Sequence, residues 1–136
     1  MTSNTILYVC DRPAGSNSVL AAIKTVGYDV VSANSSNQAM ALLFVMYAAA
    51  AVVLDLRASE QTSLDLARKL RAIHPGVPIV LRCCEHFNRL PLWVDAYVSV
   101  GEPIEKLTSI LRTLLVDEQA IPDGRLSDFQ PAIPDF

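Results

Sequence analysis

The stretch ILYVCDRPAG, residues 6–15, is an apolar run that ends in a cysteine and an aspartate and then turns through a proline and a glycine. Its first part, Ile6–Val9, is rich in β-branched and aromatic residues, which predicts a short buried strand. A second run, Ala51–Leu56, is apolar except for Asp55. Two buried strands that both end in acids predict a functional site where these strands end.

The rest of the chain alternates between apolar runs and helical periodicity. The strands predicted in this way are 6–9, 29–32, 51–56, 79–81 and 97–100. The predicted helices are 16–26, stopped by Gly27, one capped within Asn34–Ser36, one capped by Ser63, a weaker one over 85–92, and 104–116. Strands that are apolar throughout are typical of a parallel sheet covered on both faces, so we expect a doubly wound α/β fold.

Composition limits the functional classes. The chain has 136 residues, 51% of them hydrophobic, and a net charge of −3 with scattered basic residues, which argues for one globular domain and against a nucleic-acid interface. The longest apolar stretch, Leu42–Leu54, is too short for a membrane span. The polar start of the sequence and three cysteines without a secretory signal predict a cytoplasmic protein that has no disulfide framework.

The last twenty residues differ from the rest. Residues 117–136 hold three prolines, five acids and one arginine without any periodicity. We therefore expect a domain over residues 1–116 and a mobile acidic tail or linker over 117–136.

In parallel α/β sheets, ligands bind outside the carboxyl ends of the strands. The residues at these ends include Cys10, Asp11, Asp55, Cys83 and Cys84. Two converging carboxylates can share a Mg²⁺ ion, and a carboxylate can also accept a phosphoryl group. The simpler alternative is that each aspartate only caps the loop or helix that follows it.

Residues 5–116 resemble the receiver domains of two-component response regulators. The resemblance rests on ILYVCDRP at the first strand, AVVLDLR at the third, PGVPIVL before the fourth and DAYVSV at the fifth. It implies a flavodoxin-like sheet of order 2-1-3-4-5, phosphorylation of Asp55 by a histidine kinase, and Mg²⁺ bound by Asp11, Asp55 and the Arg57 carbonyl. The family's switch aromatic corresponds to Tyr97.

Three positions depart from the family's pattern. Cys10 stands where the family has a first acid, Cys83 where it has a serine or threonine, and Val100 where it has a lysine; a shifted alignment places Glu102 at the lysine position instead. These groups supply the charges and the donor that phosphoryl transfer and switching need. We therefore expect a degenerate receiver that is no enzyme beyond self-phosphorylation, binds Mg²⁺ weakly, and has altered or absent phospho-switching. A fully phospho-accepting receiver is the alternative.

The resemblance also implies how the domain acts. Receivers signal through the face of the fourth helix, fifth strand and fifth helix, often as dimers, and this region contains Phe87, Leu90, Trp93 and Tyr97. Apolar and aromatic side chains are common interface anchors. We expect contact with a histidine kinase or another signalling protein, a homodimer through this face, and no nucleic acid or membrane partner.

Other functional interpretations are based on the cysteines. Cys10 resembles the nucleophile of sugar phosphotransferase IIB domains, but Asp11 beside it opposes the electropositive setting that a reactive thiolate needs. A low-molecular-weight phosphatase requires an arginine where Ser16 stands. Redox sensing by Cys10, Cys83 and Cys84 is less favoured than simple burial, and neither His74 nor His86 has the spacing for zinc.

Overall fold

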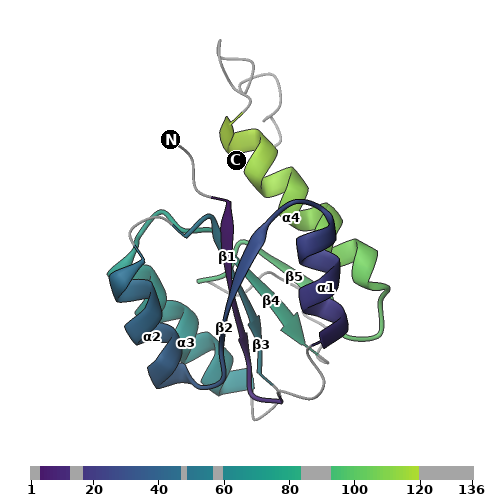
Figure 1. Ribbon diagram of the computed structural model, residues 1–136. Coiled ribbons are helices and arrows are strands. Elements are labelled where there is room, and N and C mark those ends of the chain that lie inside the picture. The colour runs from purple at the N-terminus through teal and green to yellow at the C-terminus, as the bar shows by residue number, and fades with distance from the viewer. Residues whose placement is uncertain (1–3, 13–16, 47–48, 57–59, 84–92, 120–136) are drawn as a thin grey trace, which may run out of the picture.

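The computed structural model describes residues 4–12, 17–46, 49–56, 60–83 and 93–119. Five parallel strands form one sheet of order β2-β1-β3-β4-β5, with α2 and α3 on one face and α1 and α4 on the other (Figure 1). The strands are β1 (Thr5–Cys10), β2 (Asp29–Ala33), β3 (Ala51–Asp55), β4 (Ile79–Cys83) and β5 (Ala96–Ser99). The helices are α1 (Asn17–Thr25), α2 (Ser36–Val45), α3 (Glu60–Ile73) and α4 (Ile104–Gln119). The predicted fold class and strand order are confirmed.

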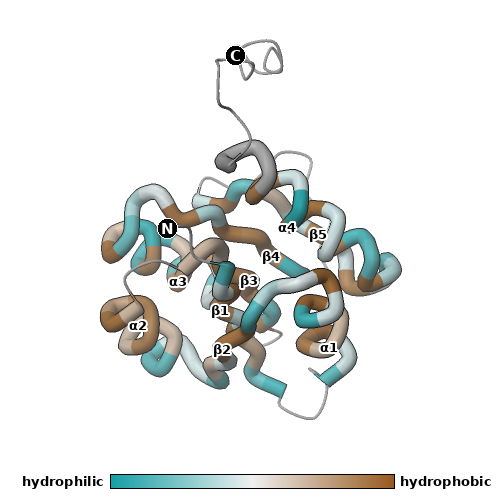
Figure 2. Tube along the Cα trace, turned by 45° about the horizontal axis from the view of Figure 1, so that its top comes forward, coloured by the Kyte–Doolittle hydropathy of each residue, from teal (hydrophilic) through white to brown (hydrophobic). Residues whose placement is uncertain are grey.

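The sheet separates two hydrophobic cores, because successive side chains of a strand point to opposite faces. Leu54 and Leu81 pack on the α2–α3 side, whereas Val53 and Val80 pack on the α1–α4 side. Every residue of β3 and β4 is buried, as a sheet covered on both faces requires. Figure 2 shows the strands as largely hydrophobic segments at the centre of the molecule.

The strand register places two charged residues side by side on the α1–α4 face. Val53 pairs with Val80 in the parallel ladder between β3 and β4. Two residues further along each strand are Asp55 and Arg82, which therefore point to the same face as that pair. Asp55 is also the register partner of Cys10 on β1.

Two helix ends that local sequence signals predicted are confirmed. Gly27, with a φ of 106°, ends α1: its N–H donates to the Lys24 carbonyl and the Tyr28 N–H donates to the Ile23 carbonyl, the paired bonds of a Schellman motif. Ser35 caps α2 by accepting a hydrogen bond from the Gln38 N–H.

One predicted helix cap was wrong, and some helices begin or end at other residues than predicted. Ser63 does not cap α3, which begins three residues earlier at Glu60; Ser63 lies buried inside the helix. Helix α4 continues to Gln119, past the predicted end at Val116. The predicted helix over 85–92 falls outside the described residues. Among the helices that the structure describes, none is long and apolar enough to cross a membrane.

Candidate functional site

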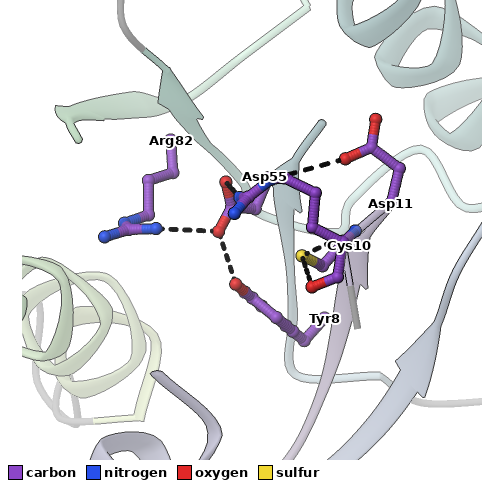
Figure 3. Close-up of polar contacts among 6 residues, drawn as sticks. Tyr8, Cys10, Asp11, Asp55 and Arg82 are labelled. Carbon is purple, nitrogen blue, oxygen red and sulfur yellow. Dashed lines mark hydrogen bonds and ion pairs between the residues drawn. The ribbon is translucent and has the colours of Figure 1, made fainter. Parts of the chain in front are cut away.

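The centre of the site is the carboxylate of Asp55, which is 0% exposed at the end of β3. Its Oδ2 atom accepts hydrogen bonds from the Tyr8 hydroxyl and from a guanidinium nitrogen of Arg82, the latter at 2.8 Å. Its Oδ1 atom accepts a hydrogen bond from Arg12 at 3.1 Å. Figure 3 shows Tyr8 and Arg82 pointing toward the carboxylate. Both oxygens of the predicted phosphoryl acceptor are therefore engaged by side chains of the protein.

The donors come from three neighbouring segments of the chain. Tyr8 lies on β1, Arg12 lies two residues after the end of that strand, and Arg82 lies on β4. The Arg82 side chain is only 10% exposed, whereas the Arg12 side chain is 36% exposed. Arg82 thus forms the buried ion pair of the site, and Arg12 covers the carboxylate from its solvent side.

The charges of this cluster balance. Asp55 and Asp11 supply two carboxylates, and Arg12 and Arg82 supply two guanidinium groups; the Arg12 Nε atom lies 3.7 Å from Asp11 Oδ1. Removing a carboxylate from water costs several kcal/mol unless cations and hydrogen bonds replace the solvent. The arginines and the tyrosine make this replacement, so burial of Asp55 is compatible with its negative charge.

Tyr8 remains a hydrogen-bond donor in this setting. Burial raises the pKa of the Tyr8 hydroxyl far above its usual value, and the hydrogen bond to Asp55 raises it further. The hydroxyl therefore keeps its proton across the physiological range and donates it to the carboxylate. Because Tyr8 packs in the core of the α1–α4 face, it fixes the carboxylate to the body of the sheet.

The predicted pocket residues occupy different places. Cys10 is buried beside Asp55, and its Sγ accepts a hydrogen bond from the Arg12 N–H and lies 3.4 Å from the Arg12 carbonyl oxygen. The Asp11 side chain is 26% exposed and faces Arg12. Cys83 is buried in the core on the α2–α3 side of the sheet, the face opposite to Asp55.

The remaining predicted residues lie further from the carboxylate or outside the described part. Val100 is half-buried, and its N–H donates to the Cys83 carbonyl at 2.9 Å. Glu102, the alternative residue for the lysine position, is exposed. Tyr97 is half-buried against the α2–α3 core. Arg57, Cys84, Phe87 and Leu90 fall outside the described residues.

The sequence analysis did not identify Tyr8, Arg12 or Arg82 as site residues. One signal was present: Arg82 is the single charged residue of the strand IVLRC, and a charged side chain in a buried strand needs an opposite charge. The register of β3 and β4 in the structure places Asp55 level with it as that partner. Tyr8 carried no comparable signal, because a tyrosine in an apolar strand is ordinary.

The donor set does not favour a divalent cation in this arrangement. Mg²⁺ takes carboxylate, carbonyl and water oxygens, yet the two Asp55 oxygens already accept from guanidinium groups and a hydroxyl. Within the described ranges, no group of three histidine, cysteine, aspartate or glutamate side chains could hold a metal ion. A cation between Asp11 and Asp55 would compete with Arg12 for Oδ1, or with Arg82 and Tyr8 for Oδ2.

Comparison with solved structures identifies the fold. A CheY-like response regulator receiver domain protein from Methanospirillum hungatei matches with a TM-score of 0.76 and 17% identity, over 88% of this chain and 98% of that one. The response regulator TrrA from Thermotoga maritima, solved with Mg²⁺ and BeF, matches with a TM-score of 0.72 and 23% identity, over 85% of this chain and 100% of that one. The chain has the fold of a CheY-like receiver domain.

Sequence comparison adds one relative. The probable transcriptional regulatory protein TcrX of Mycobacterium tuberculosis is 29% identical over 116 residues, which cover 82% of this chain and 49% of TcrX. The chain thus spans about half the length of this curated relative. No family model matches the sequence.

Proposed function

We propose that this chain is the receiver module of a response regulator in which Asp55 serves as a buried structural anion, and that the module acts through protein contacts with little or no phospho-switching. The fold and the resemblance to TcrX support the receiver role. The observation that carries the finer proposal is the complete enclosure of the Asp55 carboxylate by Tyr8, Arg12 and Arg82.

The chemical argument concerns the attacking oxygen. Phosphoryl transfer to a carboxylate needs a free oxygen in line with the phosphorus, and charge stabilisation by cations placed around the transferred group. Asp55 is buried, and each of its oxygens is a hydrogen-bond acceptor for a side chain of this protein. Reaction would first require at least one of these bonds to break, which adds its free energy to the barrier.

The alternative function is a phospho-accepting receiver that opens before it reacts. Two observations favour it: the Arg12 side chain is 36% exposed, and the similar TrrA structure contains Mg²⁺ and BeF. In this alternative Arg12 moves away from the carboxylate, and Mg²⁺ binds Asp11, Asp55 and the Arg57 carbonyl. Arg82, on the buried side, would still have to release Oδ2.

The proposed signalling partners are a histidine kinase or another signalling protein in the cytoplasm. The signalling module of this proposal is the domain predicted over residues 1–116, extended to Gln119 by the end of α4, and the residues after Gln119 are its tail. Trp93 and Tyr97 pack partly buried against the α2–α3 core near β5, and we place a homodimer face along β5 and α4. A sedimentation series up to high micromolar concentration tests this face; a monomer throughout contradicts it.

The deciding experiment is incubation with Mg²⁺ and acetyl phosphate followed by intact-mass measurement. We expect less than stoichiometric addition of a phosphoryl group to the wild type. Arg82→Thr, which removes the guanidinium from Oδ2 and leaves the Tyr8 hydroxyl there, increases the modified fraction, and the double variant Arg82→Thr/Asp55→Asn abolishes the increase. Rapid, stoichiometric phosphorylation of the wild type at Asp55 would overturn the proposal in favour of the alternative.

A further inference from the structure

An apolar hollow lies between the carboxyl ends of α2 and α3, on the face opposite to Asp55. It has a volume of about 460 Å³ and is lined by Leu43, Phe44, Met46, Ala72, Ile73 and His74. Phe44 is 76% exposed and Val45 is 67% exposed beside it. Large apolar side chains that are mostly exposed around a concave site mark a place where another apolar group binds.

Helix α2 is unusual for a surface helix. It contains no charged residue, and its exposed positions include Ala41, Phe44 and Val45, which follow one another at helical spacing. A surface helix normally presents polar and charged residues to water on its outer face. In Figure 2, most of α2 has the brown colour of hydrophobic residues. The outer face of its last turns therefore lacks the polar cover that water alone would favour.

The charged residues in the last turns of α3 are all basic. From Leu66 to Gly76 the chain contains Arg68, Lys69, Arg71 and His74 and no acid. Arg71 is neutralised by Asp95 at 2.8 Å, whereas Arg68 and Lys69 are exposed. An apolar centre with a basic rim fits a segment that combines apolar and acidic residues.

The chain itself contains such a segment beyond α4. The four residues Ala-Ile-Pro-Asp occur twice there, at 120–123 and at 132–135, and Phe136 follows the second copy. Residues 120–136 contain three acids and one arginine. Proline favours an extended conformation that loses little entropy on docking, which is common in peptides that bind apolar grooves.

The place where α4 ends determines which of the two Ala-Ile-Pro-Asp copies can reach the hollow. Each helix runs antiparallel to the strands, so α2, α3 and α4 all end at the amino edge of the sheet, but α4 lies on the opposite face (Figure 1). Ile121 is two residues after Gln119 and reaches about 7 Å, less than the roughly 10 Å of a single packed layer. Ile133 is fourteen residues after it and reaches up to about 48 Å, more than twice the roughly 20 Å width of five strands.

We propose that residues 132–136 dock in the hollow between α2 and α3 of the same chain. Ile133 is the anchor that enters the apolar site, and Asp135 lies toward the basic rim at Lys69 and His74. Docking covers the exposed side chains of Phe44 and Ile73. The proposal rests on the hollow and its rim and does not depend on the state of Asp55.

Methyl NMR of the full-length chain tests this placement with two matched variants, Ile133→Asp and Ile121→Asp. We expect Ile133→Asp to shift the Leu43, Met46 and Ile73 methyl signals, and Ile121→Asp to leave them in place. In a Phe44→Ser background, Ile133→Asp should have little further effect on these signals, because the docking site is already weakened. The wild-type methyl signals of Leu43, Met46 and Ile73 should not change on tenfold dilution.

Three results would overturn the proposal. Methyl signals of the hollow that are identical in the wild type and in Ile133→Asp would show that the segment does not dock there. Equal effects of Ile133→Asp and Ile121→Asp would show that the hollow does not prefer residues 132–135 over residues 120–123. Leu43, Met46 or Ile73 signals that change on dilution would show that the occupant comes from another chain.

Discussion

Replacement of Asp55 by asparagine probes the balance of charge in the site. In a pocket of unbalanced acids, this change would relieve repulsion and raise the free energy of unfolding. Here it removes the counter-charge of Arg82, which is 10% exposed, and of Arg12. We therefore expect Asp55→Asn to destabilise the protein.

The magnitude follows from the burial of each partner. Breaking a buried ion pair by removing one member costs about 3–5 kcal/mol. The half-exposed Arg12 pair adds at most about 1 kcal/mol. Asparagine keeps a carbonyl oxygen that still accepts one hydrogen bond, which recovers about 1 kcal/mol. The expected loss is about 3 kcal/mol, or roughly 12 °C in Tm for a domain of this size.

Urea unfolding of the wild type, Asp55→Asn, Arg82→Met and the double variant measures this effect and its origin. Because the double variant removes both charges, it should lose about 2 kcal/mol less than the sum of the single losses. Asp11→Asn is the comparison variant, with an expected loss below about 1 kcal/mol for its partly exposed side chain. An Asp55→Asn protein as stable as the wild type, or more stable, would refute the charge-balance argument.

Three further outcomes follow from the structure. Burial and Asp55 raise the pKa of Tyr8, so its contribution to the free energy of unfolding is fully present below about pH 10 and falls by about 1.4 kcal/mol per pH unit above it. Tyr8→Phe should therefore flatten the pH dependence of urea unfolding between pH 10 and 11. Gly27→Ala should cost about 1–2 kcal/mol in thermal unfolding, because Gly27 has a φ of 106°; an unchanged Tm would contradict the Schellman assignment. Asp95→Asn should cost about 1–2 kcal/mol in the same assay, since Asp95 accepts hydrogen bonds from Arg71 and from the Ile79 N–H; no loss would show that this link between α3 and β4 is dispensable.

The fold could be predicted from the sequence because its signals are local and repeated. The apolar strands 51–56 and 79–81 required cover on both faces, and Gly27 marked the end of a helix. The cap at Ser63 was predicted wrongly because serine is a good cap residue, and burial of this side chain inside α3 is a tertiary effect.

The candidate site could be predicted only in part. Asp55 and Asp11 were found because acids at strand ends are visible in the sequence. The ion pair between Asp55 and Arg82 depends on the register of β3 and β4, which brings together residues 27 positions apart. The contact with Arg12 depends on the path of the chain after β1, which no local pattern specifies. Cys83 was assigned from the family's pattern, and the structure turns it to the opposite face.

The most direct test of the central claim is an amide NMR titration with Mg²⁺, followed by beryllofluoride, on the full-length protein. If Asp55 is held by Arg12, Arg82 and Tyr8, millimolar Mg²⁺ and beryllofluoride leave the signals of Asp55 and Arg82 in place. Saturable shifts at Asp55 that require both Mg²⁺ and beryllofluoride and that spread to Tyr97 would contradict this account and identify a working phosphoryl acceptor.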